Sequence, residues 1–296
     1  MNSGQYKIAL IQMVSSFDVD KNLDRLSVLV NEAADRKPGI IFLPENFAAL
    51  GADNFYEIGK RESGEEGYIR KALSEMASGN KCWISAGTIP VANRINKGSG
   101  SGKSDITDGR VRAASILFND DGKEVARYDK IHMFDVDVAD NKRRYRESDF
   151  FEKGDSLVVV GTPIGKLGLS VCYDIRFPEL YRRLALAGAE LLSIPSAFTR
   201  VTGEAHFSTL MRARAIENFC YTIAACQGGE HDSGRQTWGR SMVVSPWGEV
   251  LGCMELGEGV LEVEIDMNEP ERIRKDMPVL EQMEIGISGD KPVIVI

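Results

Sequence analysis

The sequence predicts an α/β fold, in which helices cover the faces of β-sheets. Short apolar runs of strand length, such as residues 6–13 and 82–89, alternate along the chain with amphipathic helical patterns. The 296 residues are 43% hydrophobic and 27% charged, which is ordinary for a globular protein with a sizeable core. No apolar stretch approaches the ~20 residues needed to cross a bilayer, so no membrane association is expected.

The elements follow one another in a regular order. The first helix is predicted from Leu23, Leu26, Leu29 and Ala33, which recur at helical spacing on one face. Strands are predicted at 6–13, 40–46, 82–89, 111–118, 123–128, 157–160, 166–172, 190–195, 219–226, 240–245 and 259–266, and helices at 22–37, 65–79, 178–187, 205–217 and 269–276. Strands with helices between them in both halves favour sheets covered by helices.

The pattern contains no internal repeat and no domain boundary, so we expect one domain over residues 1–296. Two segments depart from it. Residues 93–110 are rich in Gly and Ser and are predicted to form a mobile surface loop. The tail from about 278 has little periodicity but ends in the apolar run "KPVIVI", which is expected to pair or dock on another surface, such as a second subunit.

Composition excludes several classes of function. Lys+Arg 36 against Asp+Glu 44 gives a net charge of −8, which disfavours nucleic acid as a partner. The basic run at 142–144 is interpreted as a solvated loop. Five cysteines without a CxxC pair and three widely spaced histidines predict neither a disulfide framework nor a metal site. Free thiols favour a reducing compartment, and we expect a cytoplasmic protein.

Three reactive or charged side chains stand where an apolar strand ends. Cys172 follows "GLSV" and precedes a helix that Pro178 opens, Glu45 follows "IIFLP", and Lys130 lies in "ARYDKIHMF". Each residue taken alone has an ordinary explanation. A buried cysteine is usually an inert apolar residue, a carboxylate after a strand is usually exposed or a helix cap, and lysines mostly extend to solvent.

Together the three segments resemble the nitrilase superfamily of carbon–nitrogen hydrolases. The motifs are "FLPEN" around Glu45, "YDKIHMF" around Lys130 and "SVCYDIRFPEL" around Cys172, in that order. The resemblance continues through "SAFTRVTGEAH" and "RARAIENFCY", which look like the deaminated glutathione amidase branch. It implies a four-layer αββα sandwich, no cofactor, and a homodimer or higher homo-oligomer.

The resemblance also implies roles for the site residues in amide hydrolysis. Cys172 would be the nucleophile that forms a thioester, and Glu45 the general base that later protonates the leaving amine. Lys130, with the backbone N–H of Tyr173, would hold the oxyanion. Glu147 matches a second glutamate of the family and would position these groups, although Glu152 lies nearby and stays an alternative. Asp174 is expected to bond the backbone around the turn.

The implied substrate is a small carboxylated amide. In the suggested branch it is deaminated glutathione, cleaved to an α-keto acid (2-oxoglutarate) and cysteinylglycine; the alternative is an ω-amidase acting on α-ketoglutaramate. Arg176 could bind a substrate carboxylate or pair with Glu179 or Asp174. Phe198 and Thr202 resemble substrate-contacting residues of the branch, but could equally be a core residue and a helix cap.

Two readings without hydrolysis stay open. A metabolite sensor could keep the fold and lose the chemistry, although such proteins commonly replace one of the three motif residues. A redox sensor would use a low-pKa thiol at Cys172.

Overall fold

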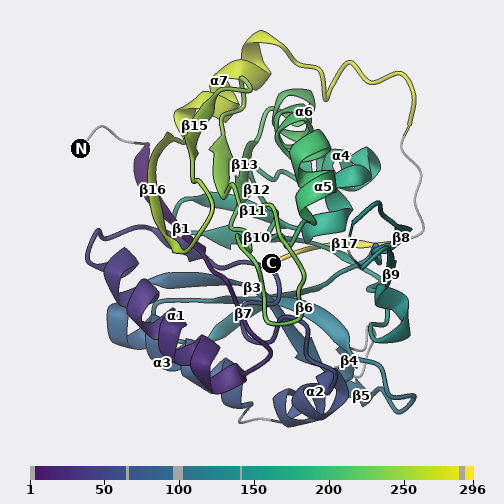
Figure 1. Ribbon diagram of the computed structural model, residues 1–296. Helices are drawn as coiled ribbons and strands as arrows, with labels where there is room; N and C mark the ends of the chain where they lie inside the picture. Colours follow the sequence, from purple (N-terminus) through teal and green to yellow (C-terminus); the bar gives the residue numbers. More distant parts are fainter. Residues whose placement is uncertain (1–3, 65–66, 96–102, 141, 287–290) are drawn as a thin grey trace.

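Two β-sheets pack face to face at the centre of the molecule, and helices cover the outer face of each sheet (Figure 1). The computed structural model describes residues 4–64, 67–95, 103–140, 142–286 and 291–296. The arrangement confirms the α/β class and the four-layer αββα sandwich that the resemblance implied.

Within the described residues, the first sheet has six strands. Their order is β16 (Gly259–Asp266), β1 (Gln5–Gln12), β2 (Ile40–Phe42), β3 (Trp83–Val91), β6 (Arg112–Phe118) and β7 (Glu124–Asp129). Strands β1, β2 and β3 run parallel, and the other neighbours are antiparallel. Because β16 pairs with β1 along its whole length, a late segment of the chain closes the sheet beside the first strand.

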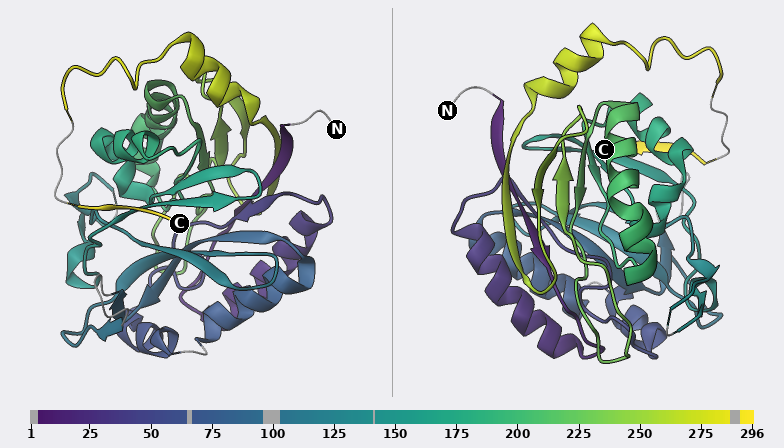
Figure 2. Two further views of the ribbon diagram at one scale, coloured as in Figure 1. Left: turned by 180° about the vertical axis from the view of Figure 1, so that it is seen from behind. Right: turned by 45° about the horizontal axis from the view of Figure 1, so that its top comes forward.

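The second sheet has seven strands among the residues described. Their order is β15 (Val250–Cys253), β14 (Met242–Val244), β13 (Tyr221–Ala224), β12 (Leu191–Ser193), β11 (Gly165–Leu169), β10 (Leu157–Thr162) and β17 (Val293–Val295). The edge strand β17 comes from the apolar tail and lies parallel to β10 (Figure 2). The tail therefore pairs, as predicted, but with a strand of its own chain.

Three helices cover the first sheet, and two cover the second. Helices α1 (Val19–Ala34), α2 (Phe55–Ser63) and α3 (Tyr68–Asn80) pack on the first sheet, and α4 (Pro178–Leu186) and α6 (Ser208–Asn218) pack on the second. Figure 2 shows these two helical layers on opposite sides of the sheets. Helix α7 (Asn268–Asp276) follows β16. No helix in the described part of the chain combines the length and the apolar character needed to cross a membrane.

Each central strand is buried on both faces, which explains why these strands read as continuous apolar runs. In β1, Ile8 and Leu10 belong to the core between the sheets, whereas Ala9 and Ile11 pack against the helices of the first layer. Helix α1 supplies Leu26 to that outer core. Its first turn is capped by the Asp18 side chain, which accepts hydrogen bonds from two backbone N–H groups.

The segment predicted as a mobile loop is partly ordered. Residues 93–95 (β4, Asn93–Ile95) and 103–105 (β5, Lys103–Asp105) form an antiparallel ribbon, and Ile106 is buried just after it. Residues 96–102 lie outside the described residues. A second ribbon joins β8 (Asp135–Asp137) to β9 (Arg144–Arg146) and leads directly into the site described below.

The sequence patterns missed helix α2 and strand β15. The fully buried residues of α2 are Gly59 and Glu62, and its large apolar residues, Phe55, Tyr56 and Ile58, fall within its first four positions and are only partly buried, so its apolar pattern is too short for a periodicity analysis to detect. The helix predicted at 205–217 is also interrupted. A single turn, α5 (Arg200–Thr202), and a π-helical turn at 203–207 precede α6, which begins at Ser208.

Candidate active site

Three strand ends bring the predicted residues together. Glu45 follows β2, Lys130 directly follows β7, and Cys172 opens a 3₁₀ helix, η2 (Cys172–Arg176), just beyond β11. All three side chains are buried, with exposed fractions of 4% for Glu45, 2% for Lys130 and 7% for Cys172. Glu45 contacts both Lys130 and Cys172, so the three side chains lie together in the structure.

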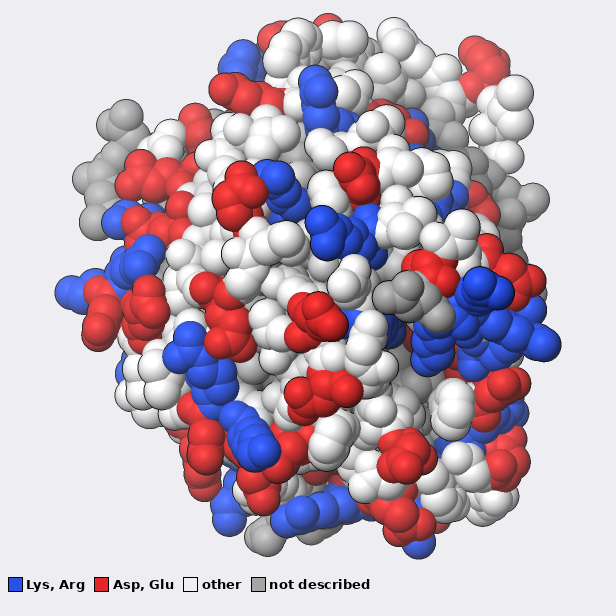
Figure 3. All heavy atoms as spheres, viewed as in Figure 1, with Lys and Arg blue, Asp and Glu red and all other residues white. Residues whose placement is uncertain are grey.

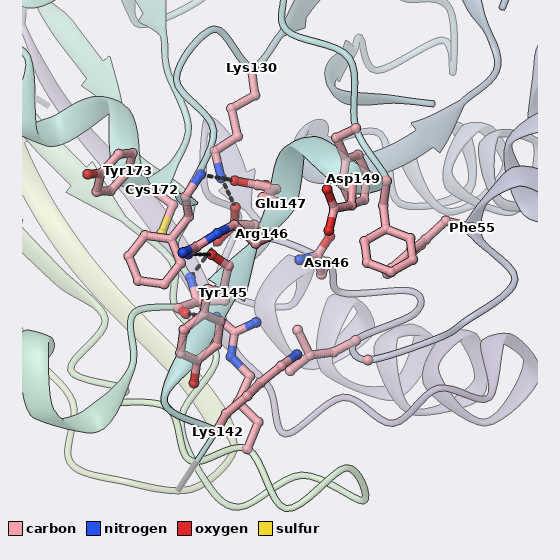
Figure 4. Close-up of a pocket in the computed structure, with 18 of the residues that line it drawn as sticks. Asn46, Phe55, Lys130, Lys142, Tyr145, Arg146, Glu147, Asp149, Cys172 and Tyr173 are labelled. Atoms are coloured by element: carbon pink, nitrogen blue, oxygen red, sulfur yellow. Dashed lines mark hydrogen bonds and ion pairs between the residues drawn. The ribbon is translucent and has the colours of Figure 1, made fainter. Parts of the chain in front are cut away.

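The Lys130 ammonium lies between two carboxylates. Its Nζ is 2.8 Å from Oε1 of Glu45, and 2.8 and 2.9 Å from the two carboxylate oxygens of Glu147 (Figure 4). Glu147 belongs to a 3₁₀ turn, η1 (Glu147–Asp149), that follows β9. Glu152, the alternative, instead pairs with Arg94 and Arg112 away from the site. The structure thus places Glu147 against Lys130.

Backbone groups complete the coordination of both carboxylates. Ala197 N–H donates to Oε2 of Glu45 at 2.9 Å, and Phe134 N–H donates to Oε2 of Glu147 at 2.6 Å. The loop that carries Glu45 passes very close to β3. Only glycine fits at position 87 of that strand, because a Cβ there would lie 1.8 Å from the Pro44 carbonyl oxygen. Each carboxylate oxygen therefore has a partner, which fixes the orientation of both side chains.

Lys130 stays charged although it is buried. Burial alone would lower the pKa of this ammonium, but the charges of Glu147 and Glu45 outweigh it and hold the pKa of Lys130 above its usual value. Burial also raises the pKa of Glu147, and the charge of Glu45 adds to that rise against the opposing effect of Lys130. The result is a fixed cation flanked by carboxylates in a space that excludes bulk water.

The thiol of Cys172 is held protonated in this resting arrangement. Burial, the charge of Glu45 and a hydrogen bond with Glu45 raise the pKa of Cys172 well above its usual value, while Lys130 and the Ala197 N–H act in the opposite direction. Cys172 also has a backbone φ of 46°, a left-handed conformation that is unusual for a residue with a side chain. Its N–H donates to the Pro195 carbonyl.

Asp174 fixes the strained turn, as the sequence analysis expected. Its carboxylate is fully buried and accepts hydrogen bonds from Val171 N–H at 2.8 Å, Tyr128 O–H at 2.7 Å and His132 N–H at 3.1 Å. The His132 ring lies 2.7 Å from the same carboxylate and stacks on Phe177. Asp174 therefore joins the segment of Lys130 to the segment of Cys172.

The three groups open into a cavity of about 570 Å³. Tyr173, Phe198 and Thr202, which we predicted to bind substrate, are among the residues that line it. Phe198 also packs against Phe207, and the Thr202 hydroxyl bonds that of Thr199 at 2.8 Å, so both residues have a structural contact as well. A cavity of this volume is large enough for a ligand bigger than a five-carbon amide.

Arg176 lies beside the cavity, next to two of the residues that line it. It is not among the residues that line the cavity, and its guanidinium lies over the rings of Tyr173 and Phe198. No described residue forms an ion pair with it, and its nearest polar partner is Nδ1 of His206 at 3.3 Å. The alternatives of pairing with Glu179 or Asp174 are therefore not what the structure shows.

Sequence reasoning missed several residues that line the cavity. Lys142 and Arg144 come from the basic run that we interpreted as a solvated loop, and Arg235 comes from a stretch of small and polar residues without periodicity. The basic run at 142–144 could have indicated an anion-binding site, whereas no pattern in the sequence distinguished Arg235 from other surface arginines. Among the residues described, no cluster of His, Cys, Asp or Glu could hold a metal ion.

An αββα sandwich with Cys, Lys and Glu buried together at the ends of its strands is the arrangement expected of a carbon–nitrogen hydrolase. Comparisons with known proteins agree with that class. The carbon-nitrogen hydrolase family model matches residues 7–275. A deaminated glutathione amidase of Yersinia enterocolitica is 40% identical over 276 residues, which cover 93% of this chain and 91% of the relative.

Solved structures give the same result. The NitFhit protein of C. elegans matches with a TM-score of 0.82 and 35% identity, covering 97% of this chain and 68% of that one. Nit3 of Saccharomyces cerevisiae, a member of branch 10 of the nitrilase superfamily, matches with a TM-score of 0.81 and 29% identity, covering 96% and 98%. The chain belongs to the carbon–nitrogen hydrolase family of the nitrilase superfamily. This assignment supports an amidase that acts on a small molecule.

A change at Glu45 tests the electrostatics of the site. Glu45→Gln removes the charge that raises the pKa of Cys172 and leaves Lys130, which lowers it, so the thiol pKa should fall. Because only the thiolate reacts, half-maximal alkylation of Cys172 by iodoacetamide should occur at a lower pH than in the wild type. Mass spectrometry of the labelled peptide across a pH series measures this midpoint.

The matched control is Glu57→Gln, which removes an exposed carboxylate of α2 that pairs with Lys60. It should keep the wild-type midpoint. A midpoint that is unchanged or higher in Glu45→Gln would mean that Glu45 does not act on the thiol.

Proposed function

We propose that the protein hydrolyses the amide bond of a small carboxylated amide through a thioester on Cys172, with deaminated glutathione as the substrate. The observation that carries the proposal is the contact of Lys130 with both Glu45 and Glu147, beside the Cys172 thiol and at the base of one cavity. The site thus supplies a nucleophile, a base and a fixed positive charge within reach of one carbonyl group.

Acylation begins with a proton transfer. Since the thiol is protonated at rest, it needs a base, and the Glu45 carboxylate is already hydrogen-bonded to it. Glu45 takes the proton while Sγ bonds to the carbonyl carbon, and the carbonyl electron pair moves onto oxygen. Lys130 and the backbone N–H of Tyr173 stabilise that oxyanion. When the C–N bond breaks, Glu45 returns the proton to the leaving nitrogen.

Deacylation uses the same groups in the same order. A water molecule gives a proton to Glu45 as its oxygen bonds to the thioester carbonyl, and Lys130 again holds the oxyanion. The C–S bond then breaks, the carboxylic acid is released, and the proton on Glu45 restores the thiol. A histidine is not required at any step, because one carboxylate alternates as base and acid.

Glu147 acts as a positioning residue. Both of its carboxylate oxygens contact Lys130 Nζ, and Phe134 N–H holds one of them. It keeps the ammonium charged and directed at the carbonyl position, so that Glu45 is free to exchange protons.

The choice of substrate is supported by the relatives and by the cavity. Relatives from Yersinia enterocolitica and Dictyostelium discoideum carry the name deaminated glutathione amidase and cover almost the whole chain. The cavity has room for a tripeptide-sized ligand and is lined by Arg144, Arg235 and Lys142, which suit a substrate with carboxylates. The role predicted for Arg176 as a carboxylate-binding residue stays a prediction.

Two rival readings are weakened by the site. A silent sensor would be expected to have lost one of the three groups, and Glu45, Lys130 and Cys172 are all present and in contact. A redox sensor needs an exposed, low-pKa thiol, whereas Cys172 is buried and its pKa is raised. We also propose a cytoplasmic location, in keeping with five free cysteines, and a homodimer or higher homo-oligomer, as in the family.

Substitutions test the assigned roles. Cys172→Ala and Glu45→Gln should each abolish turnover, because one removes the nucleophile and the other removes the only base. Lys130→Ala should lower kcat by about 10²–10³, the effect of losing one oxyanion donor. Steady-state kinetics measures kcat and KM of all three variants, and circular dichroism checks that they are folded.

Cys253→Ser is the matched control, since Cys253 is an exposed cysteine far along the chain from the site. It should retain full activity. Undiminished hydrolysis by Cys172→Ala or Glu45→Gln would reject the mechanism, and an effect of Lys130→Ala confined to KM would make Lys130 a substrate-binding residue.

A substrate panel tests the specificity. We expect kcat/KM for deaminated glutathione to exceed by far that for α-ketoglutaramate, glutaramate and N-carbamoyl compounds, because only the long substrate can reach the cations of the cavity. Release of cysteinylglycine or ammonia measures the rates. A strong preference for α-ketoglutaramate would instead identify an ω-amidase.

A further inference from the structure

Three residues on one side of the cavity form a cationic cluster, which we define as Lys142, Tyr145 and Arg235. They line the cavity that contains Cys172, and they also line a second hollow of about 650 Å³ outside it. Figure 4 shows Lys142 and Tyr145 across the cavity from the Lys130 backbone. On the face seen in Figure 3, Lys and Arg side chains gather over the segment around β8 and β9. The cluster therefore stands between the site and the outer hollow.

The two cations of the cluster lie near the same aromatic ring, and neither pairs with a carboxylate among the residues described. Lys142 Nζ is 5.2 Å and the Arg235 guanidinium carbon 5.6 Å from the centre of the Tyr145 ring. Two other cations of the cavity form ion pairs, Lys130 with Glu45 and Glu147 and Arg146 with Asp137, whereas Arg144 has none among the residues described. Among the residues described, neither Lys142 nor Arg235 forms an ion pair, and Nε of Arg235 is buried without a hydrogen-bond partner.

The positions of the cations are fixed by the fold. The Asp140 carboxylate accepts the Tyr145 O–H at 2.8 Å and the Lys142 N–H at 3.0 Å, so one side chain ties the ring to the loop that carries Lys142. Burial and the nearby charge of Arg235 lower the pKa of Lys142. The two cations thus repel one another, and an anion bound by both would relieve that repulsion.

One residue connects the cluster to the catalytic carboxylate. Arg235 donates from Nη2 to the Ala197 carbonyl at 2.5 Å, and the Ala197 N–H donates to Glu45. In the mechanism above, Glu45 protonates the leaving nitrogen. A leaving group that takes its proton from Glu45 is therefore expected on the side of the cavity where the cluster lies.

We propose that Lys142 and Arg235 bind the terminal carboxylate of the leaving group, so that the cationic cluster selects amides with a long, anionic amine portion over simple carboxamides. The inference rests on the proposed function and adds the residues that set its specificity. A guanidinium and an ammonium that line the same cavity without a carboxylate partner suit a substrate carboxylate held by charge-assisted hydrogen bonds.

The test compares two substrates that differ in one charge. These are deaminated glutathione and its derivative in which the glycine carboxylate is converted to a carboxamide. Lys142→Gln and Arg235→Gln should each lower kcat/KM for deaminated glutathione by about 10- to 100-fold, mainly through KM, since each removes one charge-assisted hydrogen bond. For the carboxamide the change should stay within about 2-fold.

Arg143→Gln is the matched control. It removes a charge from the same loop at a residue that lines neither hollow, and it should leave both substrates unaffected. Lys142→Gln is the more decisive variant, because Arg235 also supports Ala197 and Lys142 does not. Dissociation constants of both ligands for Cys172→Ala, with and without Lys142→Gln, give a readout that does not depend on turnover.

The outcomes separate this inference from the function it rests on. Equal losses for both substrates in Lys142→Gln, or no loss for either, would overturn the role of the cluster while leaving amide hydrolysis intact. Failure of the wild type to hydrolyse or bind either substrate would overturn the proposed substrate itself, and this assignment with it. Wild-type affinity that is equal for the carboxylate and the carboxamide would likewise contradict the proposal.

Discussion

The buried ammonium of Lys130, held between the carboxylates of Glu45 and Glu147, is the interaction on which the site depends. A buried charge is tolerated only when other charges and hydrogen bonds compensate it, and removing one partner of such a pair typically costs about 3–5 kcal/mol. The three residues come from a loop after β2, from the end of β7 and from η1. The two carboxylates and the ammonium therefore fix the relative positions of three segments that lie far apart in the sequence.

The residues around the site stabilise the unusual backbone conformation of Cys172. Cys172 adopts a left-handed backbone conformation, and the fully buried Asp174 stabilises the turn through backbone and side-chain donors. The absence of a Cβ at Gly87 lets β3 approach the loop of Glu45. These contacts hold the thiol, the Glu45 carboxylate and the ammonium in place before any substrate binds, which is the condition for electrostatic stabilisation without reorganisation.

Much of the fold and the centre of the site could be predicted from the sequence. Strands such as β1 are apolar on both faces, so they can be recognised in the sequence as continuous apolar runs. Glu45, Lys130 and Cys172 are unusual because each stands where an apolar strand ends. Their convergence came from the family resemblance, since periodicity says nothing about which strand ends meet. Helix α2 was missed because it is short, with its apolar side chains confined to its first four residues.

The residues that we propose to set substrate specificity could be predicted least from the sequence. Arg176 was proposed as a carboxylate-binding residue because it is close to Cys172 in sequence, but its side chain stacks on Tyr173 and Phe198. Arg235 reaches the cavity from a distant loop that has no periodic pattern, and Lys142 belongs to a basic run that is ordinary on a solvated surface. Loops are placed by tertiary contacts, and local patterns do not encode those contacts.

The most direct test of the account is an experimental structure of Cys172→Ala with deaminated glutathione bound. We expect the oxygen of the scissile carbonyl within hydrogen-bonding distance of the Lys130 ammonium and the Tyr173 N–H, and the amide nitrogen on the side of Glu45. A bound substrate whose carbonyl points away from Lys130, with its amide out of reach of Glu45, would contradict the account.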